Sequence, residues 1–177
     1  MTNDNMKVPF GYEPAPETRK GTLIFYDSFE AISDQELEIA AAVAREKSFA
    51  KFVLYPLHEE SVRRMAKSPV SAYYKREDRL HEWKRESGRE EVIVDRLDGK
   101  RKKYTPIDSV LRHIAETYPA PYFLYLTPET ANQFASYSSF EDWIVKLRLI
   151  VSSEPDRLHA KLEQYRHRWE VVSSTPV

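Results

Sequence analysis

The sequence contains no cysteine and only four glycines among its 177 residues. Without cysteine, the chain has no disulfides, no thiolate catalysis and no cysteine-based zinc sites. Its eleven prolines outnumber the glycines, so we expect turns to be built from Pro, Ser and Asp rather than from residues with positive φ. These shortages exclude the cysteine-dependent classes of enzyme and metal-binding protein.

The chain also lacks an excess of charge of one sign and any long apolar run. Its 27 basic and 28 acidic residues leave a net charge of −1, which disfavours general binding to nucleic acid or to a membrane surface. No apolar run has the length needed to span a membrane, and residues 1–20 are polar and proline-rich, unlike a signal peptide. We therefore expect a cytoplasmic protein that binds neither nucleic acid nor membranes.

Short apolar runs alternate with helix-like segments along the rest of the chain. Strands are expected at Leu23–Tyr26, Phe52–Tyr55, Glu91–Val94, Tyr122–Leu126, Leu149–Val151 and Val171–Val172. Helices are expected at 34–47, 68–88, 105–118, from Pro128, at 139–143 and at 155–168, with a polar loop at 57–68 and a hairpin-like turn at Asp98-Gly99.

This alternation predicts an α/β protein with a Rossmann-like, three-layer α/β/α fold and a mostly parallel sheet of five to six strands. Residues 1–20 are expected to form an irregular arm, and residues 21–177 a single domain. Open sheets of this kind bind ligands beyond the C-terminal ends of their strands, at the switch point of the strand order. The loops that follow the expected strands are therefore the first place to seek a site.

The middle of the chain has a distinctive order of pieces. A helix opens with Tyr104-Thr105-Pro106, the strand Tyr122–Leu126 follows, and the aromatic-rich stretch Ala131–Trp143 precedes the next strand. This order resembles the nicotinate mononucleotide adenylyltransferases, a family of Rossmann-like nucleotidyltransferases. The resemblance covers residues 21–177. It implies a nucleotidyltransferase-like domain of the adenylyltransferase type, with ATP and magnesium as cofactors and a phosphorylated mononucleotide of NAD biosynthesis as substrate.

The loop after the first strand departs from that family. The family has Gly-Ser-Phe-Asp-Pro followed by His-x-Gly-His, and Ser28–Ile32 keeps this frame. Ser33 and Glu36 stand where the two histidines are expected, and Asp27 replaces the glycine. Loss of one preorganised donor costs about 2.7–4 kcal/mol of transition-state stabilisation, and a carboxylate repels the triphosphate. No residue is therefore assigned a catalytic role.

Other positions remain candidates for binding. Those expected to contact a nucleotide are Ser28, Phe29, Arg63, Arg64, Thr105, Ser173, Ser174 and Thr175. The last three match the family's Ser-Ser-Thr signature, without the arginine that follows it there. Tyr137 and Trp143 are the candidates for stacking on a pyridine ring. Most of these residues have a plain structural alternative, such as a solvated charge for the arginines or core packing for the aromatics.

Two further features were weighed as sites. Asp34 and Glu36 carry carboxylates that a metal could bridge to phosphates, although acids at a helix N-terminus ordinarily stabilise the helix dipole. We therefore predict no metal site. The basic run Lys100–Lys103 is expected to form a basic hairpin arm exposed to water, with binding of a phosphate or an acidic partner as the alternative.

Three functions are consistent with these observations. The first, which we favour, is a catalytically impaired relative of the adenylyltransferases that binds a nucleotide or a protein partner. The second is an active enzyme that transfers AMP from ATP to nicotinate mononucleotide or a related phosphorylated substrate. The third is a scaffold or assembly protein without a small ligand. A second copy of the chain, in a homo-oligomer, is among the partners we consider for all three.

Overall fold

The computed structural model describes residues 19–172 and contains a six-stranded, all-parallel sheet. Its strands are β1 (Thr22–Asp27), β2 (Lys51–Pro56), β3 (Ile93–Val94), β4 (Tyr122–Leu126), β5 (Arg148–Val151) and β6 (Trp169–Val171). Their order is β3-β2-β1-β4-β5-β6, which confirms the predicted Rossmann-like α/β class. The order reverses between β1 and β4, so the switch point lies beyond these two strands.

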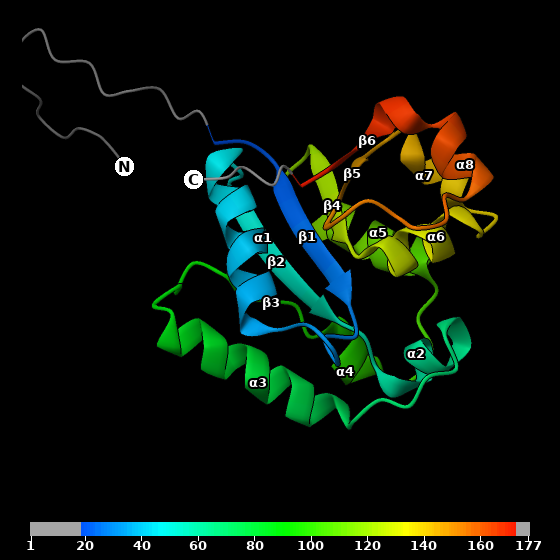
Figure 1. Ribbon diagram of the computed structural model, residues 1–177. Helices are drawn as coiled ribbons and strands as arrows, with labels where there is room; N and C mark the ends of the chain where they lie inside the picture. Colours follow the sequence, from blue (N-terminus) through cyan, green and yellow to red (C-terminus); the bar gives the residue numbers. More distant parts are fainter. Residues whose placement is uncertain (1–18, 173–177) are drawn as a thin grey trace, which may run out of the picture.

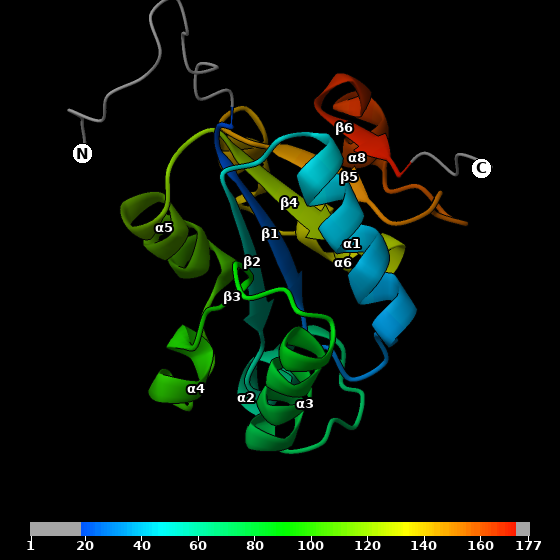
Figure 2. The same cartoon turned by 90° about the vertical axis from the view of Figure 1, so that its left-hand side faces the viewer.

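Helices cover both faces of the sheet (Figures 1 and 2). They are α1 (Asp34–Glu46), α2 (Glu59–Met65), α3 (Tyr73–Glu86), α4 (Leu97–Arg101), α5 (Ile107–Thr117), α6 (Pro128–Ala135), α7 (Phe140–Ile144) and α8 (Ala160–Gln164), followed by the 3₁₀ turn η1 (Arg166–Arg168). Helices α1 and α3 pack on one face, while α5, α6, α7 and α8 pack on the other. The molecule therefore has the expected three layers.

The central strand shows why the first apolar run forms a buried strand. All six residues of β1 are buried. Leu23 and Phe25 belong to the core beneath α1 and α3, whereas Ile24 and Tyr26 belong to the core on the opposite face. Successive side chains point to opposite faces of a strand, so a strand covered on both faces is apolar without alternation.

Two expectations near the C-terminal edge of the sheet are wrong. The segment expected to be a polar loop at 57–68 contains α2, which begins because the His58 ring accepts a hydrogen bond from the amide of Glu60 (3.1 Å). Asp98-Gly99 lies inside α4 rather than in a hairpin. Strand β3 pairs with β2 in parallel, which leaves no hairpin partner among residues 19–172.

Other boundaries also differ from the prediction. The second expected helix begins at Tyr73 instead of Ser68. Pro106 occupies the N-cap of α5, so Thr105 is not the cap. The helix expected at 155–168 is reduced to α8 and η1, and the last strand begins at Trp169. Residues 1–18 of the predicted arm, together with Ser173, Ser174 and Thr175, lie outside the described residues.

Candidate functional site

The C-terminal edge of the sheet gathers the segments expected to form a site. Helices α2, α3 and α4 lie beyond the arrowheads of β1 and β2 (Figure 1). The register pairs Asp27 at the end of β1 with Pro56 at the end of β2, and Leu126 on β4 with Val151 on β5. The loops after these four strands therefore open at one edge.

The loop after β1 turns inward directly after the strand. The buried carboxylate of Asp27 accepts a hydrogen bond from the backbone N–H of Phe29 (2.8 Å). Phe29 has a φ of 65°, and its ring is buried against Phe25 with centroids 4.8 Å apart. Burial raises the pKa of Asp27 to about 6 despite this hydrogen bond. The Phe29 side chain thus belongs to the core, and only backbone at this position is left for a ligand.

Ser33 and Glu36, where the resemblance leads us to expect histidines, bond to each other at the start of α1. The Ser33 hydroxyl accepts from the amide of Glu36 (3.1 Å), and the Glu36 carboxylate accepts from the amide of Ser33 (2.8 Å). This reciprocal arrangement is a capping box. It uses two backbone N–H groups that would otherwise be free to bind an anion at a helix N-terminus.

A buried arginine from α3 holds the loops after β1 and β2 together. Arg76 is 3% exposed and donates to the carbonyl oxygens of Ser28 (2.7 Å), Leu57 (2.6 Å) and Ser71 (2.9 Å). It also pairs with the carboxylate of Glu59 (3.2 Å). The Ser28 carbonyl is therefore already bonded within the chain. The sequence did not indicate this residue, because Arg76 stands among many charged residues on a helix.

The segment before α3 is fixed onto the same loop by a second contact. The exposed Glu30 accepts from both the amide (2.9 Å) and the hydroxyl (2.8 Å) of Ser71. These two hydrogen bonds lower the pKa of Glu30. Together with Arg76, these bonds hold the segment before α3 directly beside the loop after β1, where the sequence predicts a phosphate-binding frame.

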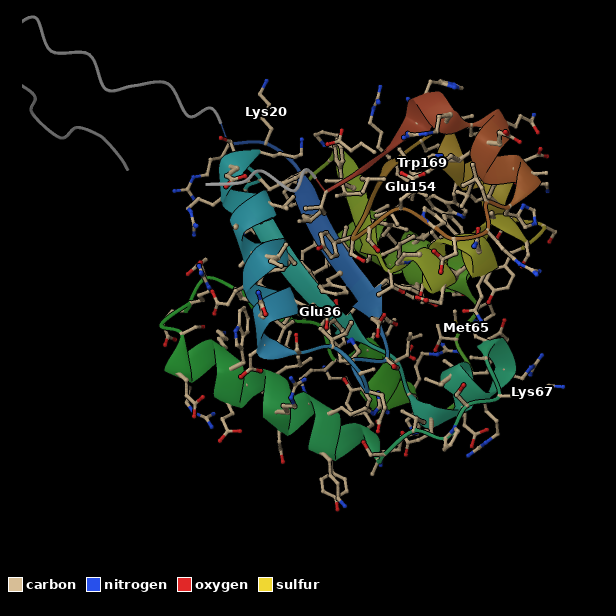
Figure 3. All side chains as sticks on the ribbon, viewed as in Figure 1. Lys20, Glu36, Met65, Lys67, Glu154 and Trp169 are labelled. Carbon is tan, nitrogen blue, oxygen red and sulfur yellow. The ribbon has the colours of Figure 1, made fainter. Side chains whose placement is uncertain are left out.

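A hollow beside the N-terminus of α1 is acidic. It has a volume of about 580 Å³ and lies between α1 and the loops after β4 and β5. Its lining residues are Glu36, Thr127, Pro128, Glu129, Asn132, Ser152, Ser153, Glu154, Asp156 and Arg157. Glu36 and Glu154 are labelled in Figure 3. The lining contains four carboxylates and one guanidinium. This excess of negative charge disfavours binding of a polyanion.

A second hollow contains one of the two stacking candidates. It has a volume of about 620 Å³ and is lined by Tyr104, Pro106, Ile107, Asp108, Arg112, Ser136, Tyr137, Ser138, Ser139 and Asp142. Tyr137 is half-buried at its wall. Trp143, in contrast, is buried, and its indole N–H donates to Asp108 (2.8 Å). Of the two stacking candidates, Tyr137 is therefore the one that lines this hollow, which we call the Tyr137 hollow.

The remaining sequence candidates are engaged in contacts within the protein. Arg64 lies over the ring of Tyr104 at 4.3 Å, whereas Arg63 pairs with Glu60 on the exposed side of α2. Thr105 is buried, and its hydroxyl accepts from Arg101 (3.0 Å). These residues stay predictions as nucleotide ligands.

Two hydrogen bonds connect opposite sides of the switch point. The side-chain amide of Gln133 on α6 donates to the carbonyl of Met65 (2.7 Å), and the hydroxyl of Tyr26 contacts the Met65 sulfur (3.6 Å). Figure 3 labels Met65 at the end of α2. The end of α2 is thereby joined to β1 and α6. No sequence motif indicated this bridge, because its residues are far apart along the chain.

A buried carboxylate from α4 organises the other side of the edge. Asp98 is fully buried and accepts from the hydroxyls of Tyr55 (2.7 Å) and Ser61 (3.0 Å) and from the amide of His58 (2.8 Å). Sequence reasoning missed this role because Asp98-Gly99 has the composition of a turn. The network fixes α2 and α4 against β2.

The two carboxylates considered as metal ligands, Asp34 and Glu36, each bond to a different partner within the protein. Asp34 pairs with Arg79 on α3 (3.1 Å), whereas Glu36 is committed to the capping box. Across the described part of the chain, no group of three or more His, Cys, Asp or Glu side chains has an arrangement that could hold a metal ion. In the same part of the chain, every helix is too short or too polar to cross a membrane.

Comparison with known proteins identifies the fold. No protein-family model matches the chain, and no curated protein sequence matches it significantly. Among solved structures, it is similar to the Plasmodium falciparum nicotinic acid mononucleotide adenylyltransferase complexed with NaAD. The TM-score is 0.68 at 10% identity, and the match covers 89% of this chain and 77% of that chain. The chain therefore has a Rossmann-like α/β fold that matches the fold of this adenylyltransferase structure.

Proposed function

We propose that this chain is a non-catalytic relative of the adenylyltransferases that binds a mononucleotide or a similar phosphorylated small molecule without transferring AMP to it. The observation that carries the proposal is the N-terminus of α1. Ser33 and Glu36 stand where the resemblance places histidines, and they satisfy each other in a capping box. The helix start is thus built for its own stability rather than for a reacting phosphate.

Electrostatics support the same conclusion. Adenylyl transfer develops negative charge that preorganised donors must stabilise. The hollow beside α1 instead presents Glu36, Glu129, Glu154 and Asp156 against Arg157. ATP with its magnesium ion does not fit this donor set, because the carboxylates repel the phosphates and are not clustered around a cation position within residues 19–172. We therefore derive no transfer step.

The Tyr137 hollow supports binding of a ring-bearing ligand. Tyr137 offers a half-buried aromatic face, and Ser136, Ser138 and Ser139 supply hydroxyls at the same wall. A single base stacked on an aromatic side chain gains about 1–3 kcal/mol. The hollow is within the usual size range for small-molecule sites, about 300–1,000 Å³.

Pyrophosphate release tests the catalytic part of the proposal. The purified protein is incubated with ATP, magnesium and nicotinate or nicotinamide mononucleotide, alongside an active adenylyltransferase as positive control. We expect no pyrophosphate above the protein-free background. Turnover at a rate ordinary for this enzyme class would refute the proposal in favour of an active enzyme.

Calorimetric titration with nicotinate mononucleotide tests the binding part. We expect saturable binding that Tyr137→Ala weakens about fivefold or more, because the stacking face is lost. Tyr137→Phe keeps the ring and is expected to retain the affinity. If no mononucleotide or nucleotide gives heat or a thermal shift, the scaffold alternative replaces this proposal.

A further inference from the structure

A third hollow lies between the starts of α2 and α3 and the short helix α4. Its volume is about 610 Å³. The lining residues are His58, Glu59, Ala72, Tyr73, Tyr74, Glu77, Arg96, Gly99, Lys100 and Lys102. We call it the α3–α4 pocket. It shares no lining residue with the Tyr137 hollow or with the acidic hollow beside α1.

The acids of this pocket are already paired, while two of its cations are not. Glu59 accepts from Arg76 and from the amide of Tyr73. Glu77 accepts from Arg96 at 2.6 Å. Lys100 and Lys102 are exposed, and neither makes an ion pair with any residue in 19–172. The pocket therefore presents uncompensated positive charge on its α4 side.

Backbone geometry brings these lysines to the pocket. The basic run was expected to be an exposed arm, but its first half forms the end of α4. Lys102 closes the helix in the left-handed conformation, with a φ of 57°. Lys100 and Lys102 line the pocket, whereas Arg101 and Lys103 do not. Arg101 instead donates a hydrogen bond to the hydroxyl of Thr105 (3.0 Å). The fold thus selects two of the four basic residues.

Aromatic rings form the opposite wall. Tyr74 is 62% exposed, which is the largest exposure among the exposed large hydrophobic side chains of the described chain. Tyr73 is buried beside it, stacks on the His58 ring at 6.3 Å, and packs so closely on Gly99 that a Cβ there would lie 2.3 Å from the ring. The Tyr73 hydroxyl is buried and has no hydrogen-bond partner within residues 19–172. An exposed ring, a rigid wall and unpaired ammonium groups thus share one hollow.

We propose that the α3–α4 pocket binds a phosphomonoester that carries a planar ring, with Lys100 and Lys102 holding the phosphate and Tyr74 contacting the ring. Ammonium groups form strong charge-assisted hydrogen bonds to phosphate oxygens, and an exposed tyrosine offers a face on which a ring can stack. The volume suits a small molecule. This site shares no lining residue with the Tyr137 hollow and does not depend on the function proposed there.

Phenyl phosphate is the probe, because it supplies a ring and a phosphate and nothing else. The ¹⁵N-labelled full chain is titrated with phenyl phosphate and, in parallel, with inorganic phosphate. We expect saturable shifts of the backbone amides in 72–74 and 96–102, with phenyl phosphate binding several-fold more tightly. Shifts confined to 104–112 and 136–142 would place the ligand in the Tyr137 hollow and overturn the inference.

Two double variants with the same change of charge test the lysines. Lys100→Ala with Lys102→Ala is expected to weaken phenyl phosphate binding about tenfold or more. Lys75→Ala with Lys103→Ala removes two exposed lysines outside the lining and is expected to change the affinity less than about twofold. Equal weakening in both would show general charge attraction and overturn the site.

Two further variants complete the test. Tyr74→Ala is expected to bring the affinity for phenyl phosphate down to that for inorganic phosphate, since only the ring contact is lost. Ile39→Ala removes another exposed apolar side chain, on α1 and outside the lining, and is expected to leave both affinities unchanged. Because this measurement involves neither ATP nor pyrophosphate, failure here leaves the proposed function untouched, and catalytic activity at the switch point would leave this site untouched.

Discussion

At the scale of single residues, Arg76 is the main support of the strand-end loops. It is buried and bonded to three carbonyl oxygens and one carboxylate. We predict that Arg76→Ala lowers the free energy of unfolding by about 3–5 kcal/mol, because the buried acceptors lose their donor. Urea unfolding measures this loss. Arg79→Ala on the same helix removes an exposed pair with Asp34 and is expected to cost no more than about 1 kcal/mol. If the two variants lost similar amounts of unfolding free energy, Arg76 would not be the main support of these loops.

Asp27 is expected to make stability depend on pH. Burial raises its pKa to about 6 from the ordinary 3.8. Between these values the folded chain binds more protons than the unfolded chain, so its stability falls as the pH rises from about 4 to 6 and is level above. The difference amounts to up to about 3 kcal/mol.

Replacement by asparagine tests this dependence. We predict that Asp27→Asn removes most of the fall in unfolding free energy between pH 4 and pH 7, measured by urea unfolding at both values. Groups other than Asp27 titrate equally in the two proteins, so the difference between them isolates this carboxyl. Asp34→Asn replaces an exposed carboxylate. It is expected to alter the decrease in unfolding free energy between pH 4 and pH 7 by less than about 1 kcal/mol. An unchanged fall in Asp27→Asn would show that Asp27 titrates normally.

At the scale of elements, the start of α1 is stabilised by a capping box that occupies two backbone N–H groups of the helix N-terminus. We predict that Ser33→Ala lowers the free energy of unfolding by about 1 kcal/mol, because the Glu36 amide loses its acceptor. Thermal or urea unfolding measures the change. Ser139→Ala is the control, since Ser139 is the N-cap of α7 but makes no side-chain capping bond. If Ser33→Ala left the free energy of unfolding unchanged, the capping box would not stabilise the helix.

Short helices at the strand ends are the elements that local sequence predicts least well. Helix α2 has seven residues and α4 has five. Helices of this length are unstable in isolation, and the buried Asp98 that connects them acts only once β2 is in place. Composition therefore favoured a loop and a turn where tertiary bonds produced helices.

At the scale of the whole molecule, Gln133 connects two sides of the switch point through Met65. We predict that Gln133→Ala accelerates hydrogen exchange of the α2 amides about fivefold, because one hydrogen bond contributes about 1 kcal/mol. Mass spectrometry of exchanging peptides measures it. Asn132→Ala is the matched control, since Asn132 bonds to Arg157 and His159 instead and its loss is expected to expose that segment. Equal exchange of α2 in both variants and the parent would show that the bridge does not hold α2.

Much of the fold followed from the sequence. The apolar runs at β1, β2, β4 and β5 identified buried strands, because strands covered on both faces need apolar side chains throughout. Their alternation with helices required parallel strands, since crossover connections need a helix between them. The same rule predicts that a ligand would bind at the C-terminal edge of the sheet.

The sequence also determined that Ser33 and Glu36 stand in the frame expected for two histidines, and that Asp27 precedes them. Tertiary structure decided what those residues do: a capping box at the start of α1 and a buried carboxyl that fixes the turn at Phe29. It alone placed Arg76 under the loops and selected Lys100 and Lys102 from a basic run. The reason is physical. Periodicity and composition record which side chains must be buried, whereas the partners of a polar group depend on segments that only folding brings together.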